Sequence, residues 1–352
     1  LVKNGAGTLT LNGANSLTGN FSLAGGSLAL GAGGSLSPTG AMTLGVGTTL
    51  DLTAAANQTI GSLAGLGGAV NLGSHTLTLG GLGNTSYSGT FGAGTGGLIK
   101  LGTGVQTLSG VNNLSGGVAL NAGGLLLGNA GALGTGALNV AGNTTLDSSV
   151  ALTLGNGVNL TGGAVLDLLG SQDVTLGGVI AGTGELVKNG ASTLTLNGPN
   201  TFSGGVGLNA GVLRLGNAGA LGTGALDVGG NASLDASAAL NLGNSVGLAA
   251  GANLTVLGSN DLTLGGPVFG AGGLIKDGAA RLTLSGANLY AGGTTINNGT
   301  LALGARGSLA AGGDVTLGNA GAGFDISAAG GNQTVAALNG VAGTALTLGG
   351  NS

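Results

Sequence analysis

The sequence predicts an all-β protein, a right-handed parallel β-helix (β-solenoid) with rungs of about 19 residues, a rung being one turn of the solenoid. Three observations indicate this fold: similar segments recur at a fixed spacing, short runs of alternating apolar and polar residues fill each segment, and glycine-rich turns separate the runs. Self-similarity at a fixed period is the mark of repeat architectures, in which each unit buries its apolar face against its neighbours.

The recurring segment has its clearest form at 186–205, LVKNGASTLTLNGPNTFSGG. Related copies begin at Leu1, Leu98 and Leu274, and the last three copies start 88 residues apart. The second and third units are identical at 54 of 88 aligned positions, which indicates a duplication. We therefore expect one continuous β-helix over 1–352, made of repeat units 1–97, 98–185, 186–273 and 274–352.

Turn residues divide the third unit into segments of 13 to 20 residues, the size of a rung. Each segment holds short alternating runs, which we expect to be strands, at 193–196, 212–215, 225–228 and 262–264. Alternation turns one face inward, so Leu194 and Leu196 are expected in the core. Parallel stacking with the usual handedness of crossovers gives a right-handed coil. The abundant glycines are expected at the corners, where positive φ is needed.

Composition excludes several classes of protein. Of 352 residues, 85 are glycine and 5% are charged, yet 42% are apolar and recur in register, unlike a disordered chain. Mean hydropathy is +0.50, but polar residues and glycine interrupt every apolar run well short of the roughly 18 residues that span a membrane as a helix. The net charge of −4 gives no field for nucleic acid, and the absence of cysteine excludes disulfides and thiolate metal sites.

The order of the motifs carries a family resemblance. The pattern Leu-x-Lys-x-Gly-x-Gly-Thr-Leu-Thr-Leu-x-Gly-x-Asn stands at 1–15 and is echoed at 98, 186 and 274. It resembles the passenger-associated repeat of bacterial type V autotransporters. The resemblance implies an extracellular β-helix displayed at the bacterial cell surface, with the outer-membrane translocator barrel of the same precursor as a partner. Since the first residues are already repeat, we expect the chain to be a segment of that longer precursor.

The expected function is that of a non-catalytic passenger segment, a rigid stalk or adhesin in cell-surface attachment or biofilm. The alternative is a self-associating extracellular fibre protein. Further expected partners are a host or glycan receptor and other copies of the rod, but no nucleic acid.

Three sets of polar residues recur at unit spacing, and each has a structural explanation. One repeat position holds a lysine, which we expect to be a paired or solvated corner residue, at Lys3, Lys100, Lys188 and Lys276. Another holds an asparagine that is expected to cap its own turn, at Asn15, Asn112, Asn200 and Asn288. A third holds an aspartate expected on an outer face, at Asp51, Asp147, Asp235 and Asp325.

The sequence contains few residues that are suited to catalysis. There is one histidine, His75, expected as an exposed strand residue, and one glutamate, Glu185. Asp167 is close in sequence to Asp173, and folding can bring it within about one rung of Asp147. Acidic clusters of this kind cut polysaccharides in some β-helices, with aromatic residues holding the sugar, but the chain has only seven aromatic residues. We therefore expect no enzyme and no catalytic, cofactor-binding or metal-binding residues.

Overall fold

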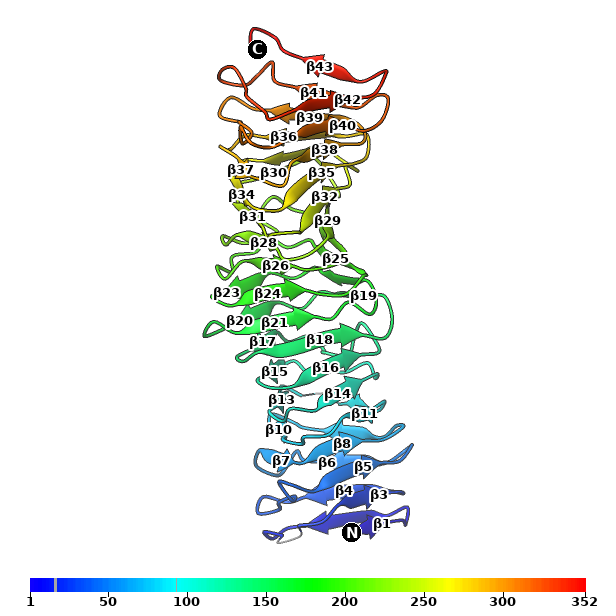
Figure 1. The fold of residues 1–352 in the computed structure, drawn as a ribbon. Helices are drawn as coiled ribbons and strands as arrows, with labels where there is room; N and C mark the ends of the chain where they lie inside the picture. Colours follow the sequence, from blue (N-terminus) through cyan, green and yellow to red (C-terminus); the bar gives the residue numbers. More distant parts are fainter. Residues whose placement is uncertain (16–17, 93) are drawn as a thin grey trace. The chain divides into compact units, whose positions relative to one another are not determined.

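The computed structural model describes residues 1–15, 18–92 and 94–352, and this described part contains strands and no helix. It confirms the predicted parallel β-solenoid. The chain divides into two compact units, Leu1–Gly184 and Glu185–Ser352, and each is considered by itself. Within each unit the strands follow one another in layers in sequence order (Figure 1). The right-handed sense and the single continuous β-helix over 1–352 stay predictions.

The first unit stacks its short strands into parallel columns. One column consists of β1 (Val2–Lys3), β3 (Phe21–Leu23), β5 (Ala41–Leu44) and β8 (Ser62–Ala64). A second consists of β2 (Thr8–Leu11), β4 (Ser27–Leu30), β6 (Thr49–Asp51), β9 (Ala69–Asn71) and β12 (Thr90–Phe91). The longest consists of β7 (Gln58–Ile60), β10 (Thr76–Leu79), β13 (Gly97–Lys100), β15 (Val118–Leu120), β17 (Leu138–Val140), β20 (Val158–Leu160) and β23 (Ile180–Gly182). The others are β11 (Thr85–Tyr87), β14 (Val105–Leu108), β16 (Gly124–Leu127), β18 (Thr144–Ser148) and β21 (Val165–Leu168), and the pair β19 (Leu152–Leu154) and β22 (Val174–Leu176).

The second unit has three such columns. The first consists of β24 (Glu185–Lys188), β26 (Val206–Leu208), β28 (Leu226–Val228), β31 (Val246–Leu248), β34 (Val268–Gly270) and β37 (Leu289–Tyr290). The second consists of β25 (Thr193–Leu196), β27 (Val212–Leu215), β29 (Ala232–Ala236), β32 (Asn253–Val256), β35 (Gly273–Lys276), β38 (Thr294–Ile296), β40 (Val315–Leu317) and β42 (Leu338–Gly340). The third consists of β30 (Leu240–Leu242), β33 (Leu262–Leu264), β36 (Arg281–Leu284), β39 (Thr300–Leu303), β41 (Gly323–Asp325) and β43 (Ala345–Thr347).

Stacked leucines form the core. Leu194, Leu213 and Leu234 pair in register on consecutive rungs and are each no more than 1% exposed. Leu196 is also buried, so both inward positions predicted for 193–196 are confirmed. Burying such a side chain stabilises the fold by about 2 kcal/mol, which short strands obtain only by stacking. Paired residues are 19 to 23 apart in the sequence, slightly more than predicted, as with Thr193–Val212 and Thr300–Gly323.

The four repeat copies share one close contact between rungs. An Asn or Ser directly after one strand lies against a Gly directly after the strand of the next rung, in the pairs Asn12–Gly31, Ser109–Gly128, Asn197–Gly216 and Ser285–Gly304. A Cβ on Gly216 would lie 2.1 Å from Oδ1 of Asn197. The polar side chain therefore occupies the space that glycine leaves, which explains why the repeat has glycine at this position.

No helix in the described ranges is both long and apolar enough to cross a membrane.

Candidate functional site

The repeated lysine is a buried corner residue in three of its four copies. Lys100, Lys188 and Lys276 are at most 3% exposed, and Lys3 is half-buried. Of the two expected alternatives, the corner lysine is paired rather than solvated in these three copies. Each starts from an inward position of its strand, two residues after a core leucine, Leu98, Leu186 or Leu274. The side chain therefore faces the interior and turns toward the corner.

The lysine amine ties two rungs together. Nζ of Lys276 donates to the carbonyl oxygens of Asp277 and Gly278 at 2.7 Å each, and to that of Asn298 on the next rung at 3.2 Å. Nζ of Lys188 makes the same set of contacts with its own corner and with Ala210. Burial lowers the pKa of Lys276 to about 8, and the nearby charges of Asp277 and Asp261 oppose that shift. In these copies the repeated lysine links adjacent rungs from inside the solenoid and does not form a binding surface. We call this set of contacts the lysine staple.

The repeated asparagine joins rungs, so the expectation that it caps its own turn accounts for only part of its contacts. Nδ2 of Asn112 donates to the carbonyl oxygen of Ala132, 20 residues ahead, and Oδ1 accepts from the N–H of Phe91, 21 residues behind. Asn288 makes equivalent contacts with the rungs on both sides, and in addition one within its own turn. Both side chains are buried, where each lost hydrogen bond would leave an unsatisfied polar group.

The repeated aspartates start from outward positions, as expected, but they are engaged in hydrogen bonds. Asp51 and Asp325 each accept from the N–H and the hydroxyl of the residue two positions on. Asp147 and Asp235 instead accept from a serine 24 residues ahead. Asp235 is only 5% exposed, so the expectation of an outer-face residue is only partly correct there.

The acidic pair considered for catalysis lies on neighbouring strands but out of register. Asp167 pairs with Thr145 rather than with Asp147, and the two carboxylate oxygens of Asp147 accept hydrogen bonds from the N–H and the hydroxyl of Ser171. His75 is half-buried and immediately precedes β10, so it is not the exposed strand residue that was expected. In the described part of the chain, no three His, Asp or Glu side chains come close enough to hold a metal ion.

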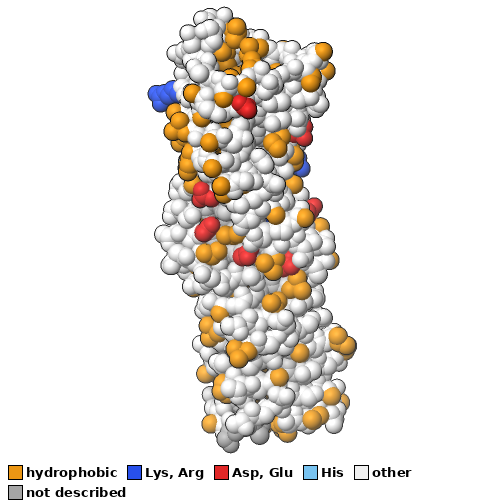
Figure 2. Space-filling model, in the orientation of Figure 1, with side chains coloured by type: hydrophobic (Ala, Val, Ile, Leu, Met, Phe, Trp, Pro, Cys, Tyr) orange, Lys and Arg blue, Asp and Glu red, His pale blue; other side chains and the backbone are white. Residues whose placement is uncertain are grey.

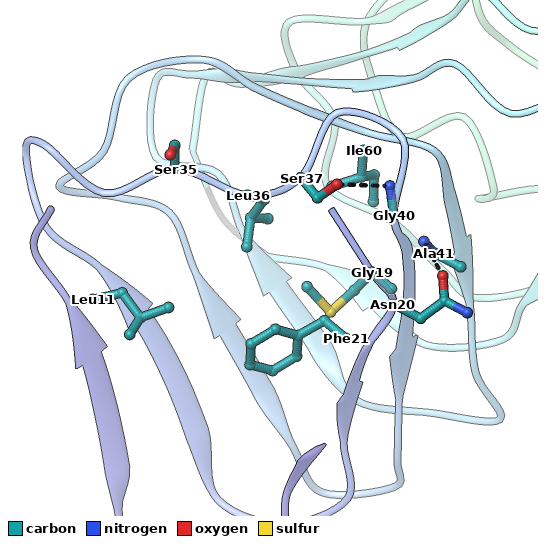
Figure 3. Close-up of a pocket in the computed structure, with 11 residues that line it drawn as sticks. Leu11, Gly19, Asn20, Phe21, Ser35, Leu36, Ser37, Gly40, Ala41 and Ile60 are labelled. Carbon is teal, nitrogen blue, oxygen red and sulfur yellow. Dashed lines mark hydrogen bonds between the residues drawn. The ribbon is translucent and has the colours of Figure 1, made fainter. Parts of the chain in front are cut away.

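A small pocket in the first unit opens between Phe21, Leu36 and Met42 (Figure 3). Its volume of about 20 Å³ has room for one water molecule and for no larger ligand. Ser37 and Asn20 beside it already hydrogen-bond to the N–H groups of Gly40 and Ala41. This pocket is a packing gap in the core.

A larger groove crosses the outer face of the second unit over β24, β26, β28, β31 and β34, with a volume of about 370 Å³. The outward positions that lie in register along it are Val187, Gly207, Asp227, Gly247 and Phe269. Glycine lies in the middle of β26 and of β31, not at a corner as the sequence suggested. Because these two strands have no side chain on this face, the surface is hollowed between bulkier neighbours.

Two carboxylates and an aromatic ring line this groove. Oε1 of Glu185 lies 3.0 Å from the position that a Cβ on Gly207 would take. A Cβ on Gly247 would lie 2.6 Å from Oδ1 of Asp227 and 3.5 Å from the ring of Phe269. Burial, and secondarily the charge of Asp227, raise the pKa of Glu185. Figure 2 shows acidic and apolar side chains exposed on this face, with no basic side chain beside them.

Sequence reasoning noted Glu185 but missed the groove. The recognisable feature was the divergence between the duplicated units, since Gly207, Asp227 and Gly247 replace Ala119, Asn139 and Asn159 at the same repeat positions. Those replacements become meaningful only when residues about 20 apart are known to stack.

Comparison with known proteins identifies the repeat. The family model of the Passenger-associated-transport-repeat matches residues 1–30, 98–127, 186–215 and 274–303, which confirms the resemblance and its four copies. The Adhesin BmaC autotransporter of Brucella suis biovar 1 (strain 1330) is 34% identical over 142 residues. The match covers 36% of this chain and 4% of that protein, so the chain corresponds to a small part of its length. No solved structure matches the chain.

Proposed function

We propose that this chain, which carries four passenger-associated transport repeats, is a non-enzymatic passenger segment of a bacterial autotransporter that acts at the cell surface as an adhesin-bearing stalk. The similarity to an autotransporter adhesin supports both the surface location and the adhesive role. The proposal includes a translocator barrel on the same precursor as the partner in export.

The observation that carries the proposal is the structural use of the residues that define the repeat. The lysine links two rungs at Lys188 and Lys276, and the asparagine bridges rungs at Asn112. Asn197, directly after β25, fills the space beside Gly216. Each of these contacts extends the stack, and none places a reactive group in a cleft. A repeat whose defining residues all serve stacking is suited to a scaffold.

Stacking also suggests how the chain leaves the cell. Each rung offers unpaired strand edges to the next, so folding can propagate along the chain as it emerges, and the free energy released can favour outward movement. We propose that for this role the solenoid is continuous over 1–352, as the repeats of the sequence predict. Small-angle scattering tests that continuity, because stacking of all rungs at about 4.8 Å predicts a rod on the order of 80 to 90 Å long.

Attachment is tested with beads coated with the purified chain. Beads carrying the folded chain should attach to host cells or to a biofilm matrix, and free folded chain should compete with them. Beads coated with heat-unfolded chain are the control for nonspecific adhesion. Equal attachment by folded and unfolded chain would contradict the adhesin proposal. Concentration-dependent filaments without attachment would instead favour the self-associating fibre.

A further inference from the structure

We propose that the groove formed by Glu185, Val187, Asp227 and Phe269 binds an amine-bearing sugar unit of a polysaccharide. The inference rests on the proposed adhesin function and names the class of ligand that the adhesin would hold. Three observations support it: the charge of the groove, its apolar wall, and the difference between the duplicated repeat units 98–185 and 186–273.

The charge of the groove favours an organic cation. Glu185 and Asp227 are its charged lining residues, and its lining contains no lysine or arginine. The lysine of the same strand, Lys188, is turned into the corner, where its amine binds carbonyl oxygens. An ammonium group that enters between the carboxylates would form charge-assisted hydrogen bonds, which are about twice as strong as neutral ones.

The apolar wall favours a sugar over a metal ion or a small amine. Phe269 is 44% exposed and leans over Gly247 toward Asp227, and Val187 lines the groove at the opposite end. The ring of Phe269 can stack on the apolar face of a pyranose, and its π-face also attracts a nearby cation. The groove crosses several strands on the outer face, so a unit of a linear polymer can lie in it.

The first unit shows that the fold does not require this groove. The equivalent positions there, in the same register on β13, β15, β17, β20 and β23, are Ile99, Ala119, Asn139, Asn159 and Ala181. Nδ2 of Asn159 donates to Oδ1 of Asn139 at 2.7 Å, so an asparagine ladder fills the space that Gly247 leaves empty. At the same positions the second unit has an acid, a glycine and an exposed aromatic ring, Asp227, Gly247 and Phe269.

The test titrates the purified chain with oligomers of β-1,4-linked glucosamine, with fully N-acetylated oligomers of the same length, and with a lysine-rich peptide. We expect the glucosamine oligomer to bind at least tenfold more tightly than the acetylated oligomer, because acetylation removes the cation. The affinity should fall as salt screens the exposed carboxylates.

The variants locate the binding. Asp227→Asn and Phe269→Ala should each weaken glucosamine-oligomer binding about tenfold. The double variant Asp227→Asn/Gly247→Asn copies the ladder of the first unit and should fold normally while losing binding. Asp314→Asn and Leu289→Ala, which change an exposed acid and the exposed residue beside Phe269 outside the groove lining, should bind like the parent chain. Thermal unfolding of each variant checks that it is folded.

Equal binding of both oligomers, unchanged binding by the ladder variant, or tighter binding of the lysine-rich peptide would overturn the proposal. The bead assay separates this failure from failure of the adhesin function. If the ladder variant still attaches beads to cells, the groove is not the adhesive site, although the adhesin proposal stands.

Discussion

Arg281 and Asp325, 44 residues apart in the sequence, form a direct ion pair that spans two rungs of the second unit, with Nη2 of Arg281 2.7 Å from Oδ2 of Asp325. Between their strands, β36 and β41, lies β39, whose residue in register with Asp325 is the small Ala302. Asp325 also accepts hydrogen bonds from the hydroxyl and the N–H of Ser327. This ion pair, which we call the external strap, links β36 to β41 on the outside of the unit. Lys276 links the first of these rungs to the next one from inside.

The strap predicts a dependence on acid. The hydroxyl of Ser327 first, then Arg281 and the N–H of Ser327, lower the pKa of Asp325 to about 2. A folded-state pKa below the unfolded value gives stabilisation that is present above about pH 4 and is lost as the pH falls through 2. Because Arg281 is 42% exposed, we expect Asp325→Asn to lower the free energy of unfolding by only about 1 kcal/mol at pH 7. Urea unfolding should show a clearly smaller difference at pH 2 than at pH 7, and an equal difference at both pH values would contradict this explanation.

The lysine staple predicts a larger effect. Lys276→Met keeps the apolar stem but leaves three carbonyl oxygens without their donor, so we expect a loss of about 2 to 4 kcal/mol in the free energy of unfolding. Arg306→Met is the matched control, because Arg306 is an exposed cation of the same unit; it should change stability by less than about 0.5 kcal/mol. Similar values for the two variants would show that the amine does not hold the rungs together.

The close contact at Gly216 predicts a specific rescue. Gly216→Ala places a methyl group 2.1 Å from Oδ1 of Asn197, so the asparagine must move, at an expected cost of about 1 to 2 kcal/mol. Adding Asn197→Ala should recover part of that loss. Gly243→Ala is the control, because nothing lies within 4 Å of the new methyl group there. Chemical unfolding of the parent chain, of Gly216→Ala, of Asn197→Ala and of the double variant completes a double-mutant cycle, and strictly additive effects would exclude the contact.

Export by stacking predicts that a core defect reduces surface display. Leu196→Asp puts an unpaired charge into the core and should cost roughly 4 kcal/mol or more. Thr195→Asp adds the same charge at the neighbouring outward position and should be tolerated. In the complete precursor, protease accessibility on intact cells should fall for Leu196→Asp and not for Thr195→Asp. Unchanged display of a destabilised Leu196→Asp chain would show that export does not depend on the stability of the fold.

Much of the fold could be predicted because alternation is a local property. The runs at 193–196, 212–215 and 262–264 are strands with the predicted bounds, and the run at 225–228 begins one residue later, at Leu226. The period was slightly underestimated, because loops lengthen some rungs. The hydrogen bonds of Asp235 with Ser259, for example, join residues 24 apart.

The polar residues were harder to place, because their partners lie on other rungs. A lysine is usually exposed, and only its inward position in the strand Gly273–Lys276 indicates that it is buried. The partners of Asn112 are 20 and 21 residues away and cannot be recognised without the register. The groove shares this difficulty, since Gly207 and Gly247 look like turn residues until they are stacked around Asp227.

Disulfide trapping tests the parallel stacking most directly, because the chain has no cysteine of its own. Thr263 and Thr283 pair in register on adjacent rungs and point outward. Neighbouring strands are about 4.8 Å apart, within the span of a disulfide, so Thr263→Cys/Thr283→Cys should form an intramolecular bond on mild oxidation. Thr263→Cys/Ala302→Cys spans two rungs, about 9.6 Å, and should form none. Failure of the first pair, or equal bonding in both, would contradict the stacked solenoid on which the staple, the groove and the proposed function depend.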